Sequence, residues 1–574
     1  MEKQVQRALL TYAAFSYIVF TLALFHIANK FSLIASALLL IFFYCFHVRN
    51  SSDVKLKKEE CMSLLVVFIL IFLLFSHVFF IPPYMRDDII YHLIVPKNIA
   101  QSGHFNVDIY NINSNFPMLF EMPLTVTELF NEWLSPFIIN YVMLILLGIF
   151  YYAVARKQFG VSYNLALFSI PLMISTPVLY DLLHSSYVEI FFTLLILATF
   201  HNYLKYIEER KENSFYYLTM LFAGLACSTK YLGMPFALFI IVMEFFLNSN
   251  RRQYYLGLSI FILPALPWYL KNWILLGNPT YPLLNWLFES PHLSTMRVTI
   301  FDQMAEDYNM GRSFLDYTLL PIKLLVGIDV TPKPGEIGFG GKLSIFFILS
   351  FLGMGFKERK IRIITLLFAM YSLLWAIYSQ QVRFLLPTMI LSSLCGLGYL
   401  EHRWEKYKPI ILILVLVIMV QNLYNIGSAM KEEKIWDLLT KKMDKESFLV
   451  SHMPYSYGMA GKINSILNPE TDKILTVGNF GRNYYFEIPV ITNTYYDVEI
   501  FDKAFKKGHI NFNKLEQFLN REGITHIMLN MEYYRKFHSM DSSVDFSALK
   551  QYFNQMMKVV FSQNSFTLYK YGEE

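Results

Sequence analysis

The chain has 574 residues, of which 55% are hydrophobic, 17% aromatic and only 16% charged. A typical soluble domain carries about 25% charged residues, so the composition excludes an ordinary soluble enzyme and favours a polytopic membrane protein. The formal net charge of +5 excludes a nucleic-acid-binding surface, because the Lys and Arg residues occur in short clusters between apolar segments.

The chain contains only four cysteines, and no two of them form a Cys-x-x-Cys pair: Cys45, Cys61, Cys227 and Cys395. Three lie within apolar segments and Cys61 borders one. We therefore expect neither a disulfide framework nor a cysteine-based metal site.

Apolar segments long enough to cross a bilayer recur along the first three quarters of the chain. We expect about 13 spans, the first of which is long enough to remain as a membrane helix rather than be removed as a signal peptide. The seventh and eighth, on either side of Lys230, could instead form one broken hairpin. The expected spans cover residues 9–27, 31–46, 62–81, 136–155, 164–182, 187–204, 217–229, 231–247, 255–275, 343–356, 361–378, 384–400 and 410–425.

Basic residues cluster in alternate loops between these spans. Lys3 and Arg7 precede the first span, Arg251 and Arg252 precede the ninth, and similar clusters follow every second span. The positive-inside rule places the N-terminus and these loops in the cytoplasm. Two long loops, 83–135 and 276–342, and everything after the last span then lie on the extracytoplasmic side.

The last part of the chain, residues 430–574, is more polar than the rest. Strand-like runs at 473–478, 490–495, 526–530 and 566–570 alternate with helical patterns such as 513–519. This alternation predicts a small extracytoplasmic α/β domain that follows a transmembrane domain over residues 1–429.

The first long loop opens with Arg86-Asp87-Asp88-Ile89-Ile90-Tyr91-His92, directly after an apolar segment. Two adjacent carboxylates at the edge of a membrane span are costly, so they indicate a functional site. The following residues predict a helix along the membrane surface that Pro96 kinks or interrupts. A spacing of four would place Asp87 with Tyr91, and Asp88 with His92, on shared helix faces. Asp87 could cap this helix or accept a proton from a reacting hydroxyl, and the residues alone leave both readings open.

This opening resembles the first outer loop of the GT-C class of polyprenyl-phosphate-sugar glycosyltransferases, in the branch of the protein O-mannosyltransferases and aminoarabinose transferases. Asp87, Asp88 and Tyr91 match an Asp-acid-x-x-Tyr pattern, although the second acid is often Glu in that family. Further segments match in the same order along the chain, and each of the first three carries one basic residue at the outer edge: 227–233 with Lys230, 271–282 with Lys271, 381–387 with Arg383, and 475–485 in the C-terminal region.

The resemblance implies that a polyprenyl monophosphate, undecaprenyl phosphate in a bacterium, gives its sugar to an extracytoplasmic glycan, lipid or protein. Asp87 would be the general base, Asp88 would orient or bind the acceptor, and Tyr91 and His92 would support the site. The site would belong to an integral protein of a bacterial cytoplasmic membrane.

Such a reaction needs positive charge where the phosphate leaves. Lys230, Arg383 and Lys271 would bind the donor phosphate; the alternative is that all three are anchors that reach the lipid–water interface. Of the two candidates for a second outer acid, Asp181 and Glu189, the resemblance favours Glu189. The partner of Glu189 would be Lys230, His184 or a metal, and a structural hydrogen bond is the alternative.

A metal is not required by these residues. His92 and His104 could join the aspartates around a divalent ion, but no His-x-x-x-His spacing is present, so we expect no metal site there. The glycine-rich segment 335–341 lacks the context of a phosphate-binding loop and is interpreted as an outer loop near the acceptor.

Two other functions compete with this interpretation. An O-antigen-ligase-like or polymerase-like enzyme would use a diphosphate-linked donor and place its basic residues in a late outer loop, so the early Asp87-Asp88 pair argues against it. A lipid or glycan transporter without chemistry would carry charges near the middle of the membrane, whereas here they gather at the outer edge. A GT-C fold that only binds its ligand is the remaining alternative.

Overall fold

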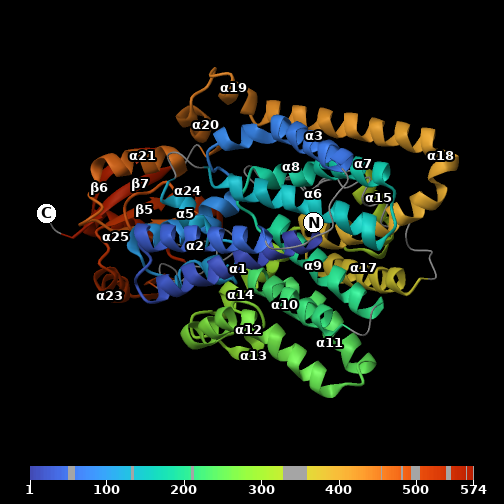
Figure 1. Cartoon of the computed structure of the whole chain (residues 1–574). Coiled ribbons are helices and arrows are strands. Elements are labelled where there is room, and N and C mark those ends of the chain that lie inside the picture. Colours follow the sequence, from blue (N-terminus) through green and yellow to red (C-terminus); the bar gives the residue numbers. More distant parts are fainter. Residues whose placement is uncertain are drawn as a thin grey trace.

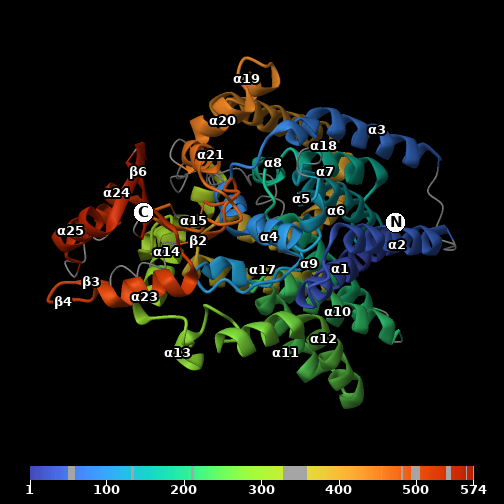
Figure 2. The same cartoon turned by 90° about the vertical axis from the view of Figure 1, so that its left-hand side faces the viewer.

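The computed structural model describes residues 1–49, 58–130, 135–208, 212–326, 358–453, 456–479, 482–492, 504–537, 544–563 and 565–572. A bundle of long helices forms one end of the molecule, and a small sheet with its own helices forms the other (Figure 1). Figure 2 looks onto the end that carries the sheet.

The long helices come from the first three quarters of the chain. They are α1 (Glu2–Leu24), α2 (Lys30–Arg49), α3 (Lys58–Phe75), α6 (Phe137–Gln158), α7 (Tyr163–Ile174), α8 (Pro177–Leu183), α9 (Glu189–Glu208), α10 (Asn213–Thr229), α11 (Gly233–Leu247), α12 (Arg251–Leu276), α17 (Arg359–Tyr378) and α18 (Val382–Glu432). The second outer loop adds α13 (Asn285–Phe288), α14 (Thr295–Asp307) and α15 (Phe314–Val326).

Eight helices among the described residues are long and apolar enough to cross a membrane, or nine if α7 and α8 form one bent span. Two shorter apolar helices cover Lys30–Phe46 and Gly233–Leu247. The expected span at 343–356 and the glycine-rich segment 335–341 lie outside the described residues. The polytopic helical architecture is confirmed, and the count of about 13 spans stays a prediction.

The expected span 164–182 is broken rather than straight. The α7 helix ends at Ile174, α8 begins at Pro177, and the two are bent by 60°. A proline has no N–H group, so it is well placed in the first turn of α8, where that group would have no partner within the helix. The bend directs the end of α8 toward the segment that leads into Glu189.

The α18 helix contains the last two expected spans and reverses direction between them. A straight helix of 51 residues would be about 75 Å long. Yet its first turn contacts Asp87 through Arg383, while Glu433 at its far end pairs with His452, whose ring packs on Tyr84. Because Tyr84 and Asp87 are three residues apart, both ends of α18 lie at the same end of the bundle.

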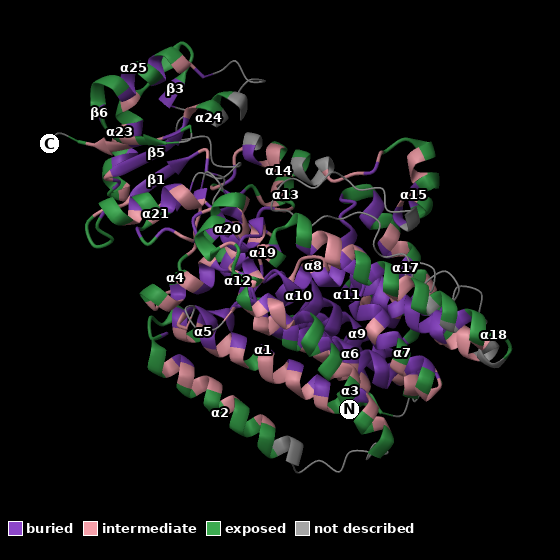
Figure 3. Ribbon diagram, turned by 90° about the horizontal axis from the view of Figure 1, so that it is seen from above, coloured by how far each residue is buried: buried purple, intermediate pink, exposed green. Residues whose placement is uncertain are grey.

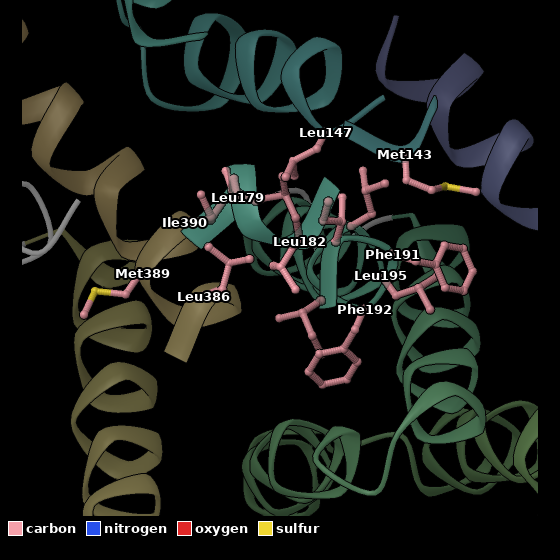
Figure 4. Packing of buried hydrophobic residues seen from close by; sticks show 14 of the residues in the cluster. Met143, Leu147, Leu179, Leu182, Phe191, Phe192, Leu195, Leu386, Met389 and Ile390 are labelled. Atoms are coloured by element: carbon pink, nitrogen blue, oxygen red, sulfur yellow. The ribbon is translucent and has the colours of Figure 1, made fainter. Parts of the chain in front are cut away.

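The α9 helix lies at the centre of the bundle and packs against α6, α10 and α18. Figure 4 shows Leu147 of α6, Leu182 of α8, Leu195 of α9 and Leu386 of α18 meeting in one apolar cluster. Figure 3 shows the same helices as a mostly buried interior, whereas α2 at the edge is exposed along much of its length. The enclosed position of α9 fixes where its first residue, Glu189, must lie.

Short helices build the first outer loop. They are the π-helix η2 (Asp88–His92), α4 (Ile94–Ser102), the 3-10 helix η3 (Ile112–Asn115) and α5 (Leu124–Glu128), with the 3-10 helix η1 (Ser76–Phe80) just before the loop. The expected surface helix is present, but its interruption lies at Leu93 rather than at Pro96. Pro96 falls in the first turn of α4, where a helix tolerates proline. The wide π-turn, closed by a hydrogen bond from the Leu93 N–H to the Asp88 carbonyl, is a feature often found at functional sites.

The C-terminal sheet has the strand order β2-β1-β5-β7-β6. β1 runs parallel to β2 and β5, and β7 runs antiparallel to β5 and β6. The strands are β1 (Ile474–Val477), β2 (Val490–Thr492), β5 (His526–Asn530), β6 (Met557–Gln563) and β7 (Phe566–Tyr571), with a separate hairpin of β3 (Phe505–Lys506) and β4 (His509–Ile510). The four strand-like runs of the sequence are found as strands, except that 493–495 lie outside the described residues.

Side chains alternate between the two faces of this sheet, as the pleat requires. Leu475 and Val477 pack with α23 (Phe512–Glu522) and α25 (Phe546–Met556), whereas Ile474 and Met528 pack with α21 (Ser456–Ile466). A further short helix, α24 (Met531–Phe537), follows β5. The sheet therefore has helices on both faces, which confirms a small α/β region.

The helices between the bundle and the sheet belong with the bundle. Ile435 of α19 (Ile435–Leu439) and Phe448 of α20 (Lys445–His452) are part of the same apolar core as the long helices. The expected domain boundary between residues 429 and 430 stays a prediction, and packing favours a boundary after α20.

The C-terminal region docks on the first outer loop through a cluster around Lys97. The Lys97 ammonium donates to the carbonyls of Tyr484 and Phe486 at 2.6 and 2.9 Å. The Tyr484 hydroxyl lies 3.0 and 3.2 Å from the two carboxylate oxygens of Glu128, and the Tyr485 hydroxyl donates to the Pro83 carbonyl at 2.6 Å. These contacts place the sheet region at the same end of the bundle as the acidic loop.

Candidate functional site

A cavity of about 240 Å³ lies where the first outer loop meets the ends of α10 and α18. Segments far apart in the sequence form its walls. They include Arg86, Asp87, Tyr91, His92, Phe116 and Glu121 of the first outer loop, Thr229, Lys230 and Tyr231 between α10 and α11, Phe301 and Tyr308 of the second outer loop, and Gln381, Arg383 and Phe384 at the start of α18.

Asp87 and Glu121 are the acids among the described residues that line this cavity, and Asp87 is the one beside the basic residues. It precedes the π-helix η2 but makes no capping hydrogen bond to it through its side chain. Its carboxylate instead accepts a hydrogen bond from Arg383 Nη2 at 3.2 Å, and its backbone N–H donates to the Tyr187 hydroxyl at 3.2 Å. The geometry therefore disfavours the helix-cap interpretation and leaves a partly exposed carboxylate available to a ligand.

Arg383 and Lys230 form the basic side of the cavity and share one buried acid. The Lys230 ammonium lies 2.7 Å from Glu189 Oε1, and Arg383 Nε lies 3.5 Å from the same oxygen. Glu189 is only 2% exposed and begins α9, so the central helix holds this carboxylate in place. Glu189 does not itself belong to the cavity wall among the described residues.

Aromatic rings orient both cations. The Lys230 ammonium lies 4.1 Å from the centre of the Phe384 ring, and the Arg383 guanidinium lies 4.7 Å from the centre of the Tyr187 ring. The Arg383 Nε also donates to Gln381 Oε1 at 3.1 Å. Cation–π contacts and a shared carboxylate preorganise positive charge on one wall of the cavity.

The side chain of Asp88 does not share the surroundings of the Asp87 side chain. It is fully buried, accepts one hydrogen bond from the Ser186 backbone N–H at 2.8 Å, and is not among the described residues that line the cavity. Its second carboxylate oxygen has no hydrogen-bond partner among the described residues. Burial raises the pKa of Asp88 well above its ordinary value, because the charged carboxylate is disfavoured away from water.

His92 and Tyr91 also line the cavity, and the His92 ring lies 5.2 Å from the ring of Tyr187. His92 Nδ1 is 2.8 Å from Glu121 Oε1, and both side chains are almost fully buried. The Tyr91 ring packs on the His92 ring with their centres 4.0 Å apart. The histidine–glutamate pair thus presents a second polar group to whatever occupies the cavity.

Lys271 does not join the site. Its ammonium donates to the Asn115 carbonyl at 3.3 Å and lies over the rings of Phe105 and Trp268, and it is not among the described residues of the cavity wall. His184, one of the partners considered for Glu189, contacts His77 and Tyr180 instead. Lys230 is the partner of Glu189.

Four contributing residues could not be singled out from the sequence: Glu121, Tyr187, Gln381 and Phe384. Gln381 and Phe384 are close to Arg383 in the sequence, and this closeness could have pointed to them. Glu121 and Tyr187 act through His92 and Asp87, which are far from them in the sequence, so no local pattern points to them. No group of three His, Cys, Asp or Glu side chains in the described part of the chain is arranged to hold a metal ion.

This arrangement can bind an anion beside a carboxylate. A phosphate can accept parallel hydrogen bonds from the guanidinium of Arg383 and a single charged contact from Lys230. Asp87 is close enough to Arg383 to compete with such a phosphate for the same guanidinium.

The sequence and the fold were compared with known proteins. A family model described as dolichyl-phosphate-mannose-protein mannosyltransferase matches residues 117–270, which include Glu189 and Lys230. A sequence comparison with curated proteins gives no significant match.

The chain is also similar to solved membrane-protein structures. The crystal structure of ArnT from Cupriavidus metallidurans in the apo state aligns with a TM-score of 0.53 and 15% identity, over 90% of this chain and 98% of that chain. The structure of ArnT from the same organism bound to undecaprenyl phosphate aligns with a TM-score of 0.51 and 15% identity, over 88% and 97%. The chain is therefore an integral membrane protein with the fold of the GT-C glycosyltransferases, and its resemblance to the protein O-mannosyltransferase and aminoarabinose-transferase branch is confirmed.

Proposed function

We propose that the protein is a membrane glycosyltransferase that moves a sugar from a polyprenyl phosphate to an extracytoplasmic acceptor. One observation carries the proposal: Asp87, Lys230 and Arg383, from three distant segments, face a single cavity. The similarity in fold to a protein bound to undecaprenyl phosphate supports a lipid-linked donor.

The donor phosphate would bind between Arg383 and Lys230. Both cations are held in place by Glu189, which balances part of their charge before the donor arrives. A preorganised positive wall stabilises the negative charge that develops on the departing phosphate, because the protein groups need not reorient during the reaction.

Donor binding also prepares the base. In the structure Arg383 contacts Asp87 as well as Glu189. A phosphate that takes the place of Asp87 on Arg383 leaves the Asp87 carboxylate without its cation, and such a carboxylate accepts a proton more readily. The same cation would therefore bind the donor and free the base.

The chemical step is a single displacement. Asp87 takes the proton of the acceptor hydroxyl or amine, and the electron pair of that acceptor atom forms the new bond to the anomeric carbon. The bond between this carbon and the phosphate oxygen breaks, and its electron pair leaves with polyprenyl phosphate, which Lys230 and Arg383 hold. A single displacement inverts the configuration of the sugar carbon.

Asp88, His92 and Tyr91 have supporting roles in this proposal. Asp88 fixes the segment before α9 through Ser186 and so positions Asp87 rather than touching the acceptor. His92, paired with Glu121, and Tyr91 face the acceptor side of the cavity. Lys271 does not contact the donor.

The membrane orientation belongs to the proposal. The distribution of Lys and Arg favours a cytoplasmic N-terminus. The outer loop and the C-terminal sheet, which contact each other, then lie on the extracytoplasmic side, where the sheet region would bind the acceptor or cover the cavity.

Release of polyprenyl phosphate tests the activity. Purified protein in lipid is incubated with a panel of polyprenyl-phosphate sugars, with and without glycan, lipid and peptide acceptors. We expect the wild type to release polyprenyl phosphate from one of the donors. The rate of this release should fall about 100-fold or more in Asp87→Asn. Equal rates in the two proteins would remove the base role, and no release with any member of the panel would contradict the donor class.

A further inference from the structure

Two histidines meet close to the ends of α3 and α8. His77 belongs to η1, directly after α3, and His184 is the residue that caps α8. Their Nε2 atoms are 3.2 Å apart. His184 is only 1% exposed.

Backbone carbonyls fix which nitrogen of each ring carries the proton. His77 Nδ1 lies 3.0 Å from the Leu74 carbonyl oxygen, and His184 Nδ1 lies 2.9 Å from the Tyr180 carbonyl oxygen. A carbonyl only accepts hydrogen bonds, so each Nδ1 must be the donor. In the neutral rings both Nε2 atoms are then unprotonated, and their lone pairs face each other.

The surrounding groups leave this repulsion only partly satisfied. The Tyr180 hydroxyl is 3.3 Å from His77 Nε2 and has one proton to donate, so it can serve one of the two nitrogens. At least one of the two facing Nε2 lone pairs is therefore left without a proton from the Tyr180 hydroxyl.

We propose that His77 and His184 bind a divalent transition-metal ion of the zinc class. A zinc–nitrogen bond of about 2.0–2.1 Å and a tetrahedral angle place two ligating nitrogens about 3.3 Å apart, which agrees with the observed separation. A hydrogen bond from the second ring nitrogen to a carbonyl is the usual way in which a protein orients a metal-binding histidine.

The site is an open one. Among the described residues no third His, Cys, Asp or Glu completes it. The Tyr180 hydroxyl and solvent would fill the remaining positions. It is distinct from the metal arrangement considered for His92 and His104, neither of which contacts this pair.

The metal would act as a clamp rather than in the reaction. The segment that follows His184 holds both aspartates: the Ser186 N–H donates to Asp88, and the Tyr187 hydroxyl accepts from the Asp87 N–H. His77 lies in η1, in the segment that connects α3 to the same two aspartates. An ion bound by both His77 and His184 would link the segment before the aspartates to the segment that holds them through Ser186 and Tyr187.

Metal binding is measured directly on the full-length protein in detergent. The protein is stripped with a chelator, and uptake of Zn²⁺ and the absorption spectrum of added Co²⁺ are recorded. We expect one ion per chain, a rise in melting temperature on adding Zn²⁺, and a Co²⁺ spectrum typical of nitrogen and oxygen ligands. His77→Gln, on the more accessible side, should weaken Zn²⁺ binding by about tenfold or more.

Two variants keep the result interpretable. His509→Gln, at an exposed histidine of β4, should bind Zn²⁺ like the wild type. Tyr180→Phe retains the ring and should shift the Co²⁺ spectrum without abolishing binding. The proposal is overturned if stripped wild type takes up no ion, or if His77→Gln binds Zn²⁺ as tightly as His509→Gln does.

Discussion

The two adjacent aspartates of the outer loop have opposite surroundings. Asp87 faces the cavity and is paired with Arg383, whereas Asp88 is fully buried and one of its oxygens has no partner among the described residues. Burial raises the pKa of Asp88 and so disfavours its charged form, and an uncharged amide of the same shape keeps an oxygen for the Ser186 N–H.

We therefore expect Asp87→Asn and Asp88→Asn to differ sharply. The first variant loses the carboxylate that accepts the proton, and the transfer rate should fall about 100-fold or more. The second keeps an oxygen that accepts from Ser186 and should lose far less activity. Initial rates of polyprenyl phosphate release from the two folded variants provide the measurement, and a larger loss in Asp88→Asn would reverse the assignment of the base.

The basic residues can be separated in the same way. Lys230 lies on the cavity wall, whereas Lys271 is held by the Asn115 carbonyl outside it. Lys230→Gln should weaken binding of undecaprenyl phosphate about tenfold, because it removes one hydrogen bond from a charged group. Lys271→Gln should leave this affinity unchanged. Binding is followed by native mass spectrometry in detergent. Equal affinity in wild type and Lys230→Gln would make Lys230 an interfacial anchor.

At this scale the sequence indicates which residues matter but not which of them meet. Charges at the ends of apolar spans are costly, so Asp87, Lys230 and Arg383 could be chosen as candidates. Lys271 could be chosen for the same reason, because the sequence does not give the rotation of a helix about its axis. Glu121 could not be found, since its role depends on His92, 29 residues away in the chain.

At the scale of elements, the docking of the C-terminal sheet on the outer loop depends on a titratable group. Burial raises the pKa of Glu128 from 4.5 to about 7, although the Tyr484 hydroxyl and Lys97 both favour the ionised form. When the sheet separates, Glu128 becomes solvated and its pKa returns toward 4.5. The docked state then binds more protons than the separated state between these two values, so docking is strongest below pH 4.5 and weakens as the pH rises through about 7.

Hydrogen exchange of the segment around Tyr484 measures this dependence. We expect faster exchange at about pH 8 than at about pH 5.5 after correction for the intrinsic rate. Glu128→Gln, which keeps an oxygen for the Tyr484 hydroxyl, should exchange slowly at both pH values. Exchange that is independent of pH in the wild type would show that Glu128 is not the group concerned.

Elements with a clear period could be predicted, and the places where they bend could not. The strands β1, β5 and β7 follow from short apolar runs with turn residues between them. The break between α7 and α8, the reversal within α18 and the π-turn of η2 depend on contacts with other helices. These three irregular features are the ones that bring Glu189, Arg383 and Asp87 together.

At the scale of the whole molecule, the orientation in the membrane decides where the reaction takes place. Single cysteines at Glu487, beside the outer loop, and at Arg252, in the exposed first turn of α12, are introduced into a chain without its native cysteines. A membrane-impermeant thiol reagent applied to intact cells should label the first and not the second. The reverse pattern would place the acidic loop in the cytoplasm and exclude an extracytoplasmic acceptor.

The central claim is that Lys230 and Arg383 hold a carrier-lipid phosphate beside Asp87. A cryo-EM structure of the protein with undecaprenyl phosphate measures this most directly. We predict phosphate density within hydrogen-bond distance of both cations, and a distance between Asp87 and Arg383 that exceeds the 3.2 Å of the ligand-free structure. Phosphate bound elsewhere, with the contact between Asp87 and Arg383 unchanged, would contradict the account.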